Sequence, residues 1–293
     1  MTEDLEVSLP ATHRLTRGAR SIAYCELGDP TGTPVIAAHG SPGSRYQLLA
    51  LEQAALRANV RIICPDRPGF GDTSPEPRRG FGTGSDDAIA LLDVLGISRA
   101  VALGFSGGAG YSLALALAHP DRIDRVVLAC GMIPGAPRRA LRGRIPIVSA
   151  LYRVARVLPP LAVMMLDGRG PFASTREANL SAWPAADQAI MADPRARAMT
   201  APDGRAAAKQ GSRAAVDDLR QYSRPFPLTQ VQQRVDLLHG TADGNVPVNV
   251  ARWGRSQLRD AVLREIPGGG HYFAVADPEA VVAALRAPLA GTS

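Results

Sequence analysis

The stretch of sequence that decides the fold is Ala100-Val-Ala-Leu-Gly-Phe-Ser-Gly-Gly-Ala-Gly-Tyr-Ser-Leu-Ala-Leu-Ala-Leu-Ala118. Its first six residues form a continuous apolar run that predicts a buried strand, and the residues from Gly107 onward predict a buried helix. The run is uncharged and approaches the length of a membrane span. Its glycine and serine residues lie in the middle, where they would leave lipid-facing backbone badly packed. We therefore interpret it as a strand, a turn and a helix of a soluble protein.

The turn Gly104-Phe105-Ser106-Gly107-Gly108 fits the motif G-x-S-x-G in the strand-to-helix context that this motif requires. A serine at this place stands on strained backbone between small residues, and its hydroxyl is pushed into the cleft. The helix that starts at Gly107 also turns its free N–H groups toward that point. The motif by itself is moderately specific, since a glycine-rich turn without chemistry also fits it.

Apolar runs elsewhere in the chain predict further strands of the same sheet. Continuous apolar strands separated by helical patterns indicate a parallel sheet that is buried on both faces. The expected strands are residues 21–27, 34–39, 60–65, 100–105, 125–130, 234–239 and 261–266, and the expected helices are residues 46–58, 85–95, 107–118, 248–258 and one from Pro278.

The pattern changes after Gly131. Residues 134–229 contain many proline, arginine and alanine residues in helical pieces but no convincing strand, and the strand pattern resumes at Arg234. We predict a core made of residues 1–133 and 230–293, interrupted by a helical insertion at 134–229. An insertion at the carboxyl ends of two strands lies over the crevice where open α/β sheets bind ligands, so we expect it to form a lid, or cap domain.

The 293 residues carry a net charge of +6, and residues 134–229 alone hold 15 basic and 7 acidic residues, a net charge of +8. Solvated arginines on helix faces are the simpler explanation, because this segment lacks interleaved aromatic residues and any nucleic-acid-binding signature. The three cysteines, Cys25, Cys64 and Cys130, lie far apart and form no CxxC pair. This excludes a zinc ribbon and a disulfide framework. The cysteine pattern and the acidic N-terminus, which predicts no signal peptide, together favour a cytoplasmic protein.

A serine hydroxyl needs a base, and the base needs an acid that orients it. In folds with this turn the order along the chain is serine, acid, histidine. Among five histidines only His271 comes late enough, in a flexible turn after the last expected strand. Asp243 follows the strand before it. Ser106, Asp243 and His271 are therefore the candidate catalytic residues.

The other histidines and nearby acids are expected to be structural. His13 precedes the sheet, His119 caps the helix after the serine, and His39 and His239 shape turns before a glycine. Asp236 lies within an expected strand, and Asp260 lies beyond the next expected helix.

Acyl transfer also needs two donors aimed at the developing oxyanion. One expected donor is the backbone N–H of Gly107. The other is the N–H of Ser41 in His39-Gly-Ser-Pro-Gly43, since Pro42 has none to give and Gly40 lets the chain bend. A plain proline–glycine turn explains this loop as well.

Five ordered motifs together resemble the α/β-hydrolase superfamily: HGSPG (39–43), DRPGFGDTSPEP (66–77), GFSGG (104–108), HGTADGNVPV (239–248) and GGGHYF (268–273). The resemblance implies an α/β fold in which a mostly parallel eight-stranded sheet is flanked by helices. Within the superfamily the loops are most similar to serine-nucleophile esterases, haloperoxidases and iminopeptidases, although the insertion resembles none of them. For residues 66–69 the resemblance implies a structural turn.

The residue at the nucleophile position limits the classes of reaction that we expect. Haloalkane dehalogenases and epoxide hydrolases of this superfamily attack with a carboxylate, whereas this chain has Ser106. We expect a serine hydrolase that cleaves a small-molecule carboxylic ester or lactone through an acyl-enzyme, with no metal and no cofactor. Thioesters, amides and carbon–carbon bonds beside a ketone stay open. The positive insertion favours neutral or anionic substrates over a substrate ammonium, which argues against an iminopeptidase.

Two other classes of function would use the same residues. One is a non-hydrolytic member, a lyase or cofactor-free oxygenase, whose turnover would survive Ser106→Ala. The other is a catalytically silent ligand-binding member. The sequence indicates neither a nucleic-acid partner nor a membrane span, and it leaves the substrate and the oligomeric state open.

Overall fold

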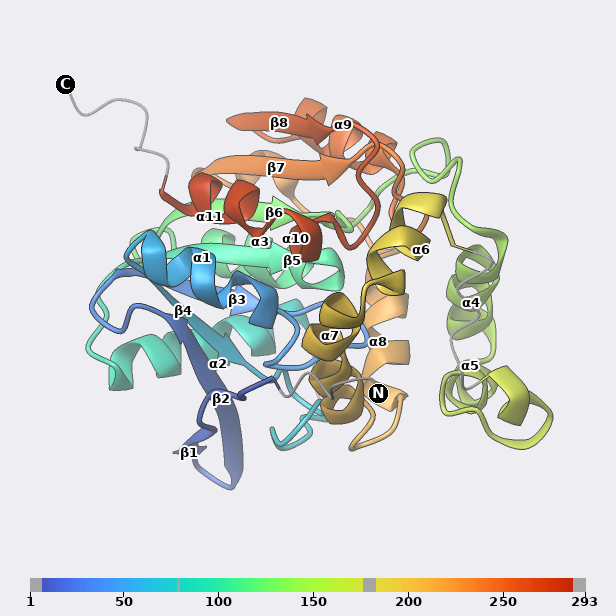
Figure 1. The fold of residues 1–293 in the computed structure, drawn as a ribbon, viewed down its shortest axis with the longest axis horizontal. Coiled ribbons are helices and arrows are strands. Elements are labelled where there is room, and N and C mark those ends of the chain that lie inside the picture. Colours follow the sequence, from blue (N-terminus) through green and yellow to red (C-terminus); the bar gives the residue numbers. More distant parts are fainter. Residues whose placement is uncertain (1–6, 78–79, 176–182, 287–293) are drawn as a thin grey trace.

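A computed structural model describes residues 7–77, 80–175 and 183–286 of the chain (Figure 1). Eight strands form one sheet in the order β1-β2-β4-β3-β5-β6-β7-β8. The strands are β1 (His13–Arg17), β2 (Arg20–Gly28), β3 (Thr33–Ala38), β4 (Val60–Pro65), β5 (Ala100–Phe105), β6 (Ile123–Ala129), β7 (Arg234–Gly240) and β8 (Ala261–Ile266).

The sheet is mostly parallel, as the sequence predicts. Only the pairs β1–β2 and β2–β4 are antiparallel. From β4 to β8 every neighbouring pair is parallel. Parallel strands all end at the same edge of a sheet, so the residues that follow β3, β5 and β7 come together there although they are far apart in the chain.

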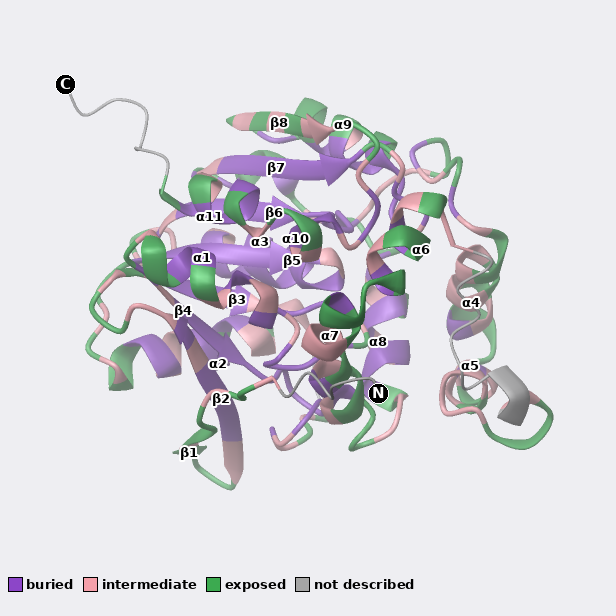
Figure 2. Cartoon of the chain, viewed as in Figure 1, coloured by how far each residue is buried: buried purple, intermediate pink, exposed green. Residues whose placement is uncertain are grey.

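Helices cover both faces of the sheet and divide the apolar core in two. On one face α2 (Phe81–Val94), α3 (Ala109–Ala118) and α9 (Val248–Gln257) pack on one buried cluster. On the other face α1 (Glu52–Arg57) and α11 (Pro278–Arg286) pack on a second. Strand β5 alternates between them, and all six of its residues are buried (Figure 2). A strand buried on both faces fixes the turn that follows it rigidly in the molecule.

Each of the seven strands expected from apolar runs is present within a few residues of its expected bounds. The eighth, β1, was not expected from its sequence, and the prediction that His13 precedes the sheet is wrong, because His13 is the first residue of β1. The reason is that β1 is an edge strand with four of its five residues exposed, so it carries no apolar run. The helix expected at 46–58 is shorter, with a 3-10 turn at Leu49–Leu51 before α1.

The described residues of the segment 134–229, between β6 and β7, contain helices and no strand. In Figure 1 these helices lie at the carboxyl ends of the parallel strands. They are α4 (Pro146–Val157), α5 (Pro159–Leu166), α6 (Ala185–Ala192), α7 (Pro194–Ala207) and α8 (Arg213–Gln221). Across the described chain, no helix combines the length and apolarity that a membrane crossing requires.

Candidate active site

Ser106 lies in a turn that the rest of the fold holds tightly. Its φ of 50° is in the left-handed region, which side chains other than glycine rarely adopt. A Cβ on Gly104 would lie 2.8 Å from the Cα of Ala109, and a Cβ on Gly108 would lie 1.9 Å from the carbonyl oxygen of Ala38. The small residues around Ser106 are therefore required by the close approach of β3 and α3.

The structure brings Ser106, His271 and Asp243 together at the carboxyl end of the sheet. The Oγ of Ser106 lies 2.9 Å from Nε2 of His271, and Nδ1 of His271 lies 2.8 Å from Oδ2 of Asp243. The other oxygen of Asp243 accepts the backbone N–H groups of Asn245 and Val246, each at 2.8 Å. The carboxylate is thus fixed on one side by the loop after β7 and on the other by the imidazole.

Asp243 and His271 each stabilise the charged form of the other. Burial raises the pKa of Asp243, but the neighbouring His271 and His239 outweigh burial and hold it below its ordinary value. Burial lowers the pKa of His271, but the Asp243 carboxylate outweighs it, and the pKa is raised above the ordinary 6.5. Asp243 is therefore ionised at neutral pH, and it stabilises the charged form of the imidazole.

A second imidazole faces Asp243, which the sequence did not reveal. His239 lies at the end of β7, where its Nε2 is 2.7 Å from the carbonyl oxygen of Val246 and 3.4 Å from Oδ2 of Asp243. It holds the loop that carries the acid, so its predicted role in the turn is incomplete. The spacing of four residues between the histidine and the acid was the available signal.

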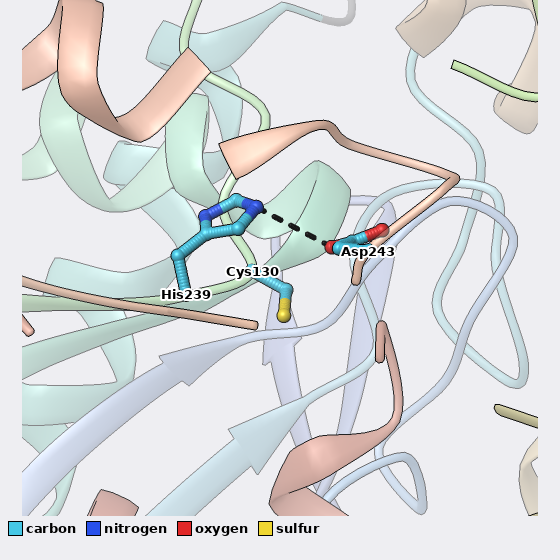
Figure 3. A group of neighbouring side chains, drawn as sticks. All are labelled: Cys130, His239 and Asp243. Carbon is cyan, nitrogen blue, oxygen red and sulfur yellow. Dashed lines mark ion pairs between the residues drawn. The ribbon is translucent and has the colours of Figure 1, made fainter. Parts of the chain in front are cut away.

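Cys130, His239 and Asp243 are the one group in the described ranges with three candidate metal-ligand atoms close together, all within 4.8 Å of one another (Figure 3). These atoms do not fit a metal well. Both oxygens of Asp243 and the Nε2 of His239 already make hydrogen bonds, so a cation would have to replace them. We interpret the group as the packing around the carboxylate.

The two expected oxyanion donors come from loops that touch. A Cβ on Gly107 would lie 2.9 Å from the backbone nitrogen of Ser41, so the peptide after Ser106 and the loop after β3 are in contact. Nothing in the described part of the chain accepts the Ser41 N–H. The preceding N–H, that of Gly40, donates to Oε1 of Gln47. This loop therefore keeps one N–H unused beside Ser106.

A buried ion pair ties the same loop to helix α8. Nη1 of Arg67 donates to Oδ2 of Asp218 at 2.6 Å, and Nη2 of Arg67 donates to the carbonyl oxygen of Gly40 at 2.7 Å. The hydroxyl of Ser41 donates to the same carboxylate, and the Tyr111 hydroxyl donates to its Oδ1 at 2.6 Å. Arg67 lies in the turn for which the sequence implied a structural role. The contact with Asp218 was not expected.

The positive net charge of segment 134–229 does not mean that its positive residues face the site. Its basic residues are exposed wherever the structure describes their side chains, with the exception of Arg144. Two of its acids, Asp187 and Asp218, are fully buried against the core. The expectation of neutral or anionic substrates, which was based on net charge, thus loses that argument and stays untested.

Two acids of this segment touch the loops around the site. Oδ1 of Asp187 in α6 accepts the backbone N–H of Tyr272 at 2.9 Å, next to His271, and burial raises the pKa of Asp187. Asp203 in α7 accepts the backbone N–H of Ser44 at 2.6 Å, and desolvation raises the pKa of Asp203 to about 7. Helices α6, α7 and α8 therefore each place a carboxyl group on a loop at the carboxyl end of the sheet.

This geometry can be compared with known proteins. A family model described as "Alpha/beta hydrolase family" matches residues 35–284. The chain belongs to the alpha/beta hydrolase family. A relative in Caulobacter sp. (strain K31), named "Putative carbamate hydrolase RutD", is 28% identical over 276 residues, which are 86% of this chain and 94% of the relative.

Solved structures of other proteins share the fold. The bromoperoxidase from Bacillus anthracis superposes with a TM-score of 0.71 at 22% identity, covering 94% of this chain and 98% of that one. The esterase RhEst1 from Rhodococcus sp. ECU1013 superposes with a TM-score of 0.65 at 21% identity, covering 94% and 99%. At such identities the likeness shows the fold alone.

Proposed function

We propose that this member of the alpha/beta hydrolase family is a serine hydrolase that cleaves a small-molecule carboxylic ester or lactone through an acyl-enzyme on Ser106. The observation that carries the proposal is the continuous chain of hydrogen bonds from Asp243 through His271 to the Oγ of Ser106. In this arrangement a weak nucleophile has its base within reach, and the base has its orienting acid.

The proposed reaction runs in two halves. His271 takes the proton of Ser106 as the hydroxyl attacks the acyl carbon, and the negative oxygen that forms is held by the N–H groups of Ser41 and Gly107. His271 then gives the proton to the leaving group. In the second half His271 activates a water that releases the acyl group, while Asp243 stabilises the imidazolium each time.

The choice of an oxygen ester rests on chemistry and on the relatives together. Ser106 stands where dehalogenases and epoxide hydrolases of the superfamily carry a carboxylate. The Rhodococcus relative is named an esterase and the Caulobacter relative a carbamate hydrolase, and both names describe cleavage at a carbonyl carbon. A thioester or an amide would use the same steps.

We further propose that residues 134–229 act as a lid. Three contacts support this role: Asp187 of α6 bonds to the loop of His271, Asp203 of α7 bonds to the loop after β3, and Asp218 of α8 bonds to Ser41 in that loop. A change in the position of these helices would therefore change the loops that carry the base and the oxyanion donor.

The test uses p-nitrophenyl esters of graded acyl length and a fluorophosphonate probe, with Ser106→Ala and, as a control, Ser256→Ala, which removes an exposed hydroxyl on α9. We expect the probe to label Ser106 in the wild type and in Ser256→Ala, and ester turnover to vanish only in Ser106→Ala. Turnover that survives Ser106→Ala would favour a lyase or oxygenase. A protein that neither hydrolyses esters nor reacts with the probe would be a binding protein.

A further inference from the structure

Four arginines are buried in the described part of the chain: Arg45, Arg67, Arg125 and Arg144. Three of them face a carboxylate. Arg45 pairs with Asp66, Arg67 with Asp218 at 2.6 Å, and Arg125 with Asp236 at 3.5 Å. Arg144 has no carboxylate of the described residues within 4.0 Å, although it is only 8% exposed.

The groups that contact Arg144 carry no negative charge, so they do not neutralise its guanidinium. Nη2 lies 3.0 Å from the sulfur of Met132, a weak acceptor, and the guanidinium lies 4.4 Å from the centre of the Tyr152 ring. Nε is buried without a hydrogen-bond partner. A buried cation that is not paired is costly, so proteins rarely keep one unless something else supplies the negative charge.

Three observations place Arg144 at the candidate active site. The backbone N–H of Met132 donates to the carbonyl oxygen of Ser106 at 2.9 Å, and Met132 is the residue that Nη2 touches. The N–H of Ile145 donates to the carbonyl oxygen of Gly244 at 2.8 Å, directly after Asp243. The charge of Arg144 also counts among the influences that lower the pKa of His271.

Three buried carboxylates around the site, those of Asp187, Asp218 and Asp243, form no ion pair with this guanidinium. The carboxylate of Asp243 is engaged by His271, and that of Asp218 is engaged by Arg67. Arg144 is therefore a fork of N–H donors in a desolvated place beside the reacting groups, with its charge still available. Carboxylates are the groups that match such a fork with two parallel hydrogen bonds.

We propose that Arg144 binds a carboxylate carried by the substrate, so that the enzyme acts on esters or lactones that have a free carboxylate at some distance from the scissile bond. This inference rests on the proposed hydrolase function and names its substrate class. Binding would give Arg144 the negative partner that the described residues do not supply, and it would hold the reacting carbonyl at a fixed distance from Ser106.

The test compares two p-nitrophenyl esters of equal methylene count, the mono-ester of adipic acid, which is an anion, and the hexanoate, which is neutral. We expect kcat/KM in the wild type to favour the anionic ester by about tenfold or more. Arg144→Met should remove that preference, chiefly through KM, and Arg144→Lys should restore part of it because it keeps the charge without the fork. The control is Arg142→Met, which removes an exposed positive charge two residues away and should leave the ratio unchanged.

A second measurement needs no variant. Adipamate, which has an amide at one end and a carboxylate at the other, should raise the thermal midpoint of the wild type at a concentration about tenfold lower than hexanamide does. Equal ester ratios in the wild type and Arg144→Met, or equal binding of the two amides, would overturn the inference. If adipamate binds tightly while Ser106 neither reacts with a fluorophosphonate nor supports turnover, the hydrolase function fails and the anion site stands.

Discussion

Ser106, His271 and Asp243 depend on one another through single atoms. Nε2 of His271 is 2.9 Å from the Ser106 hydroxyl because its other nitrogen is held by a carboxylate, and that carboxylate is held by two backbone N–H groups. Only one ring nitrogen then remains free to accept a proton. The proposed catalysis therefore depends on the hydrogen bonds behind the imidazole as much as on the imidazole itself.

The pH dependence of turnover follows from the raised pKa of His271. The imidazole must be neutral to accept the proton of Ser106, so kcat/KM for a neutral ester should fall as pH decreases through a value above 6.5. Asp243→Asn removes the charge that raises this pKa, so the fall should move to lower pH, and the rate should drop by about 10⁴-fold. A pH–rate profile from about pH 5 to about pH 9 measures both. An unshifted profile in Asp243→Asn would contradict the assignment of the acid.

The turn around Ser106 has no room for a side chain at Gly108, so a larger residue there should destabilise the protein. Gly108 has a φ of −83°, which any residue adopts, so only the contact of a new Cβ with Ala38 at 1.9 Å opposes Gly108→Ala. We expect this change to destabilise the protein by about 1–3 kcal/mol or more and to lower turnover. Gly82→Ala in α2 is the control, because a Cβ there meets nothing within 4 Å, and it should alter stability by less than about 1 kcal/mol. Urea unfolding of the two variants measures the difference, and equal stabilities would contradict it.

At the scale of elements, helix α8 is joined to the loop after β3 by the pair of Arg67 and Asp218. Asp218→Asn would leave the buried guanidinium without its counter-charge, at a cost of about 3–5 kcal/mol. The loop that carries the Ser41 N–H would lose one of its supports, so we expect kcat to fall more than KM rises. Asp217→Asn is the matched control. The Asp217 carboxylate, one residue away, is partly exposed and makes a weak ion pair with Arg220 at 3.7 Å, so its loss should have little effect.

Thermal unfolding and ester kinetics together distinguish positioning from stability in the Asp218→Asn variant. If stability falls while kcat and KM measured well below the midpoint stay at wild-type values, the ion pair is structural only. A wild-type pH–rate profile is expected in either case, because Asp218 does not contact His271 directly.

The parts of the fold that sequence could predict are those with a strong local pattern. The strands from β2 to β8 are apolar runs, and the order of Ser106, Asp243 and His271 along the chain follows from a motif with a fixed context. Strand β1 was missed because its residues are exposed and carry no such run. The contacts of Asp218 and Arg144 with the site were missed for another reason: the first joins residues more than a hundred positions apart, the second depends on the path of an irregular loop, and no local pattern encodes either.

For the molecule as a whole, the distribution of charge matters more than its sum. The arginines of segment 134–229 whose side chains the structure describes are exposed, apart from Arg144, and exposed charges are largely screened at physiological ionic strength. The preference for anionic esters that we propose should therefore persist between about 0.05 and about 0.5 M NaCl, because a buried contact is screened much less. A preference that disappears at the higher concentration would point instead to the outer arginines.

If Ser106 and His271 act as one catalytic unit, their substitutions cannot have independent effects; kcat/KM for one neutral ester in Ser106→Ala, His271→Ala and the double variant measures this. We expect each single change to lower kcat/KM by about 10⁴-fold or more and the double variant to lose no more than the worse single one. Losses that multiply, or a Ser106→Ala protein that keeps most of its turnover, would contradict it.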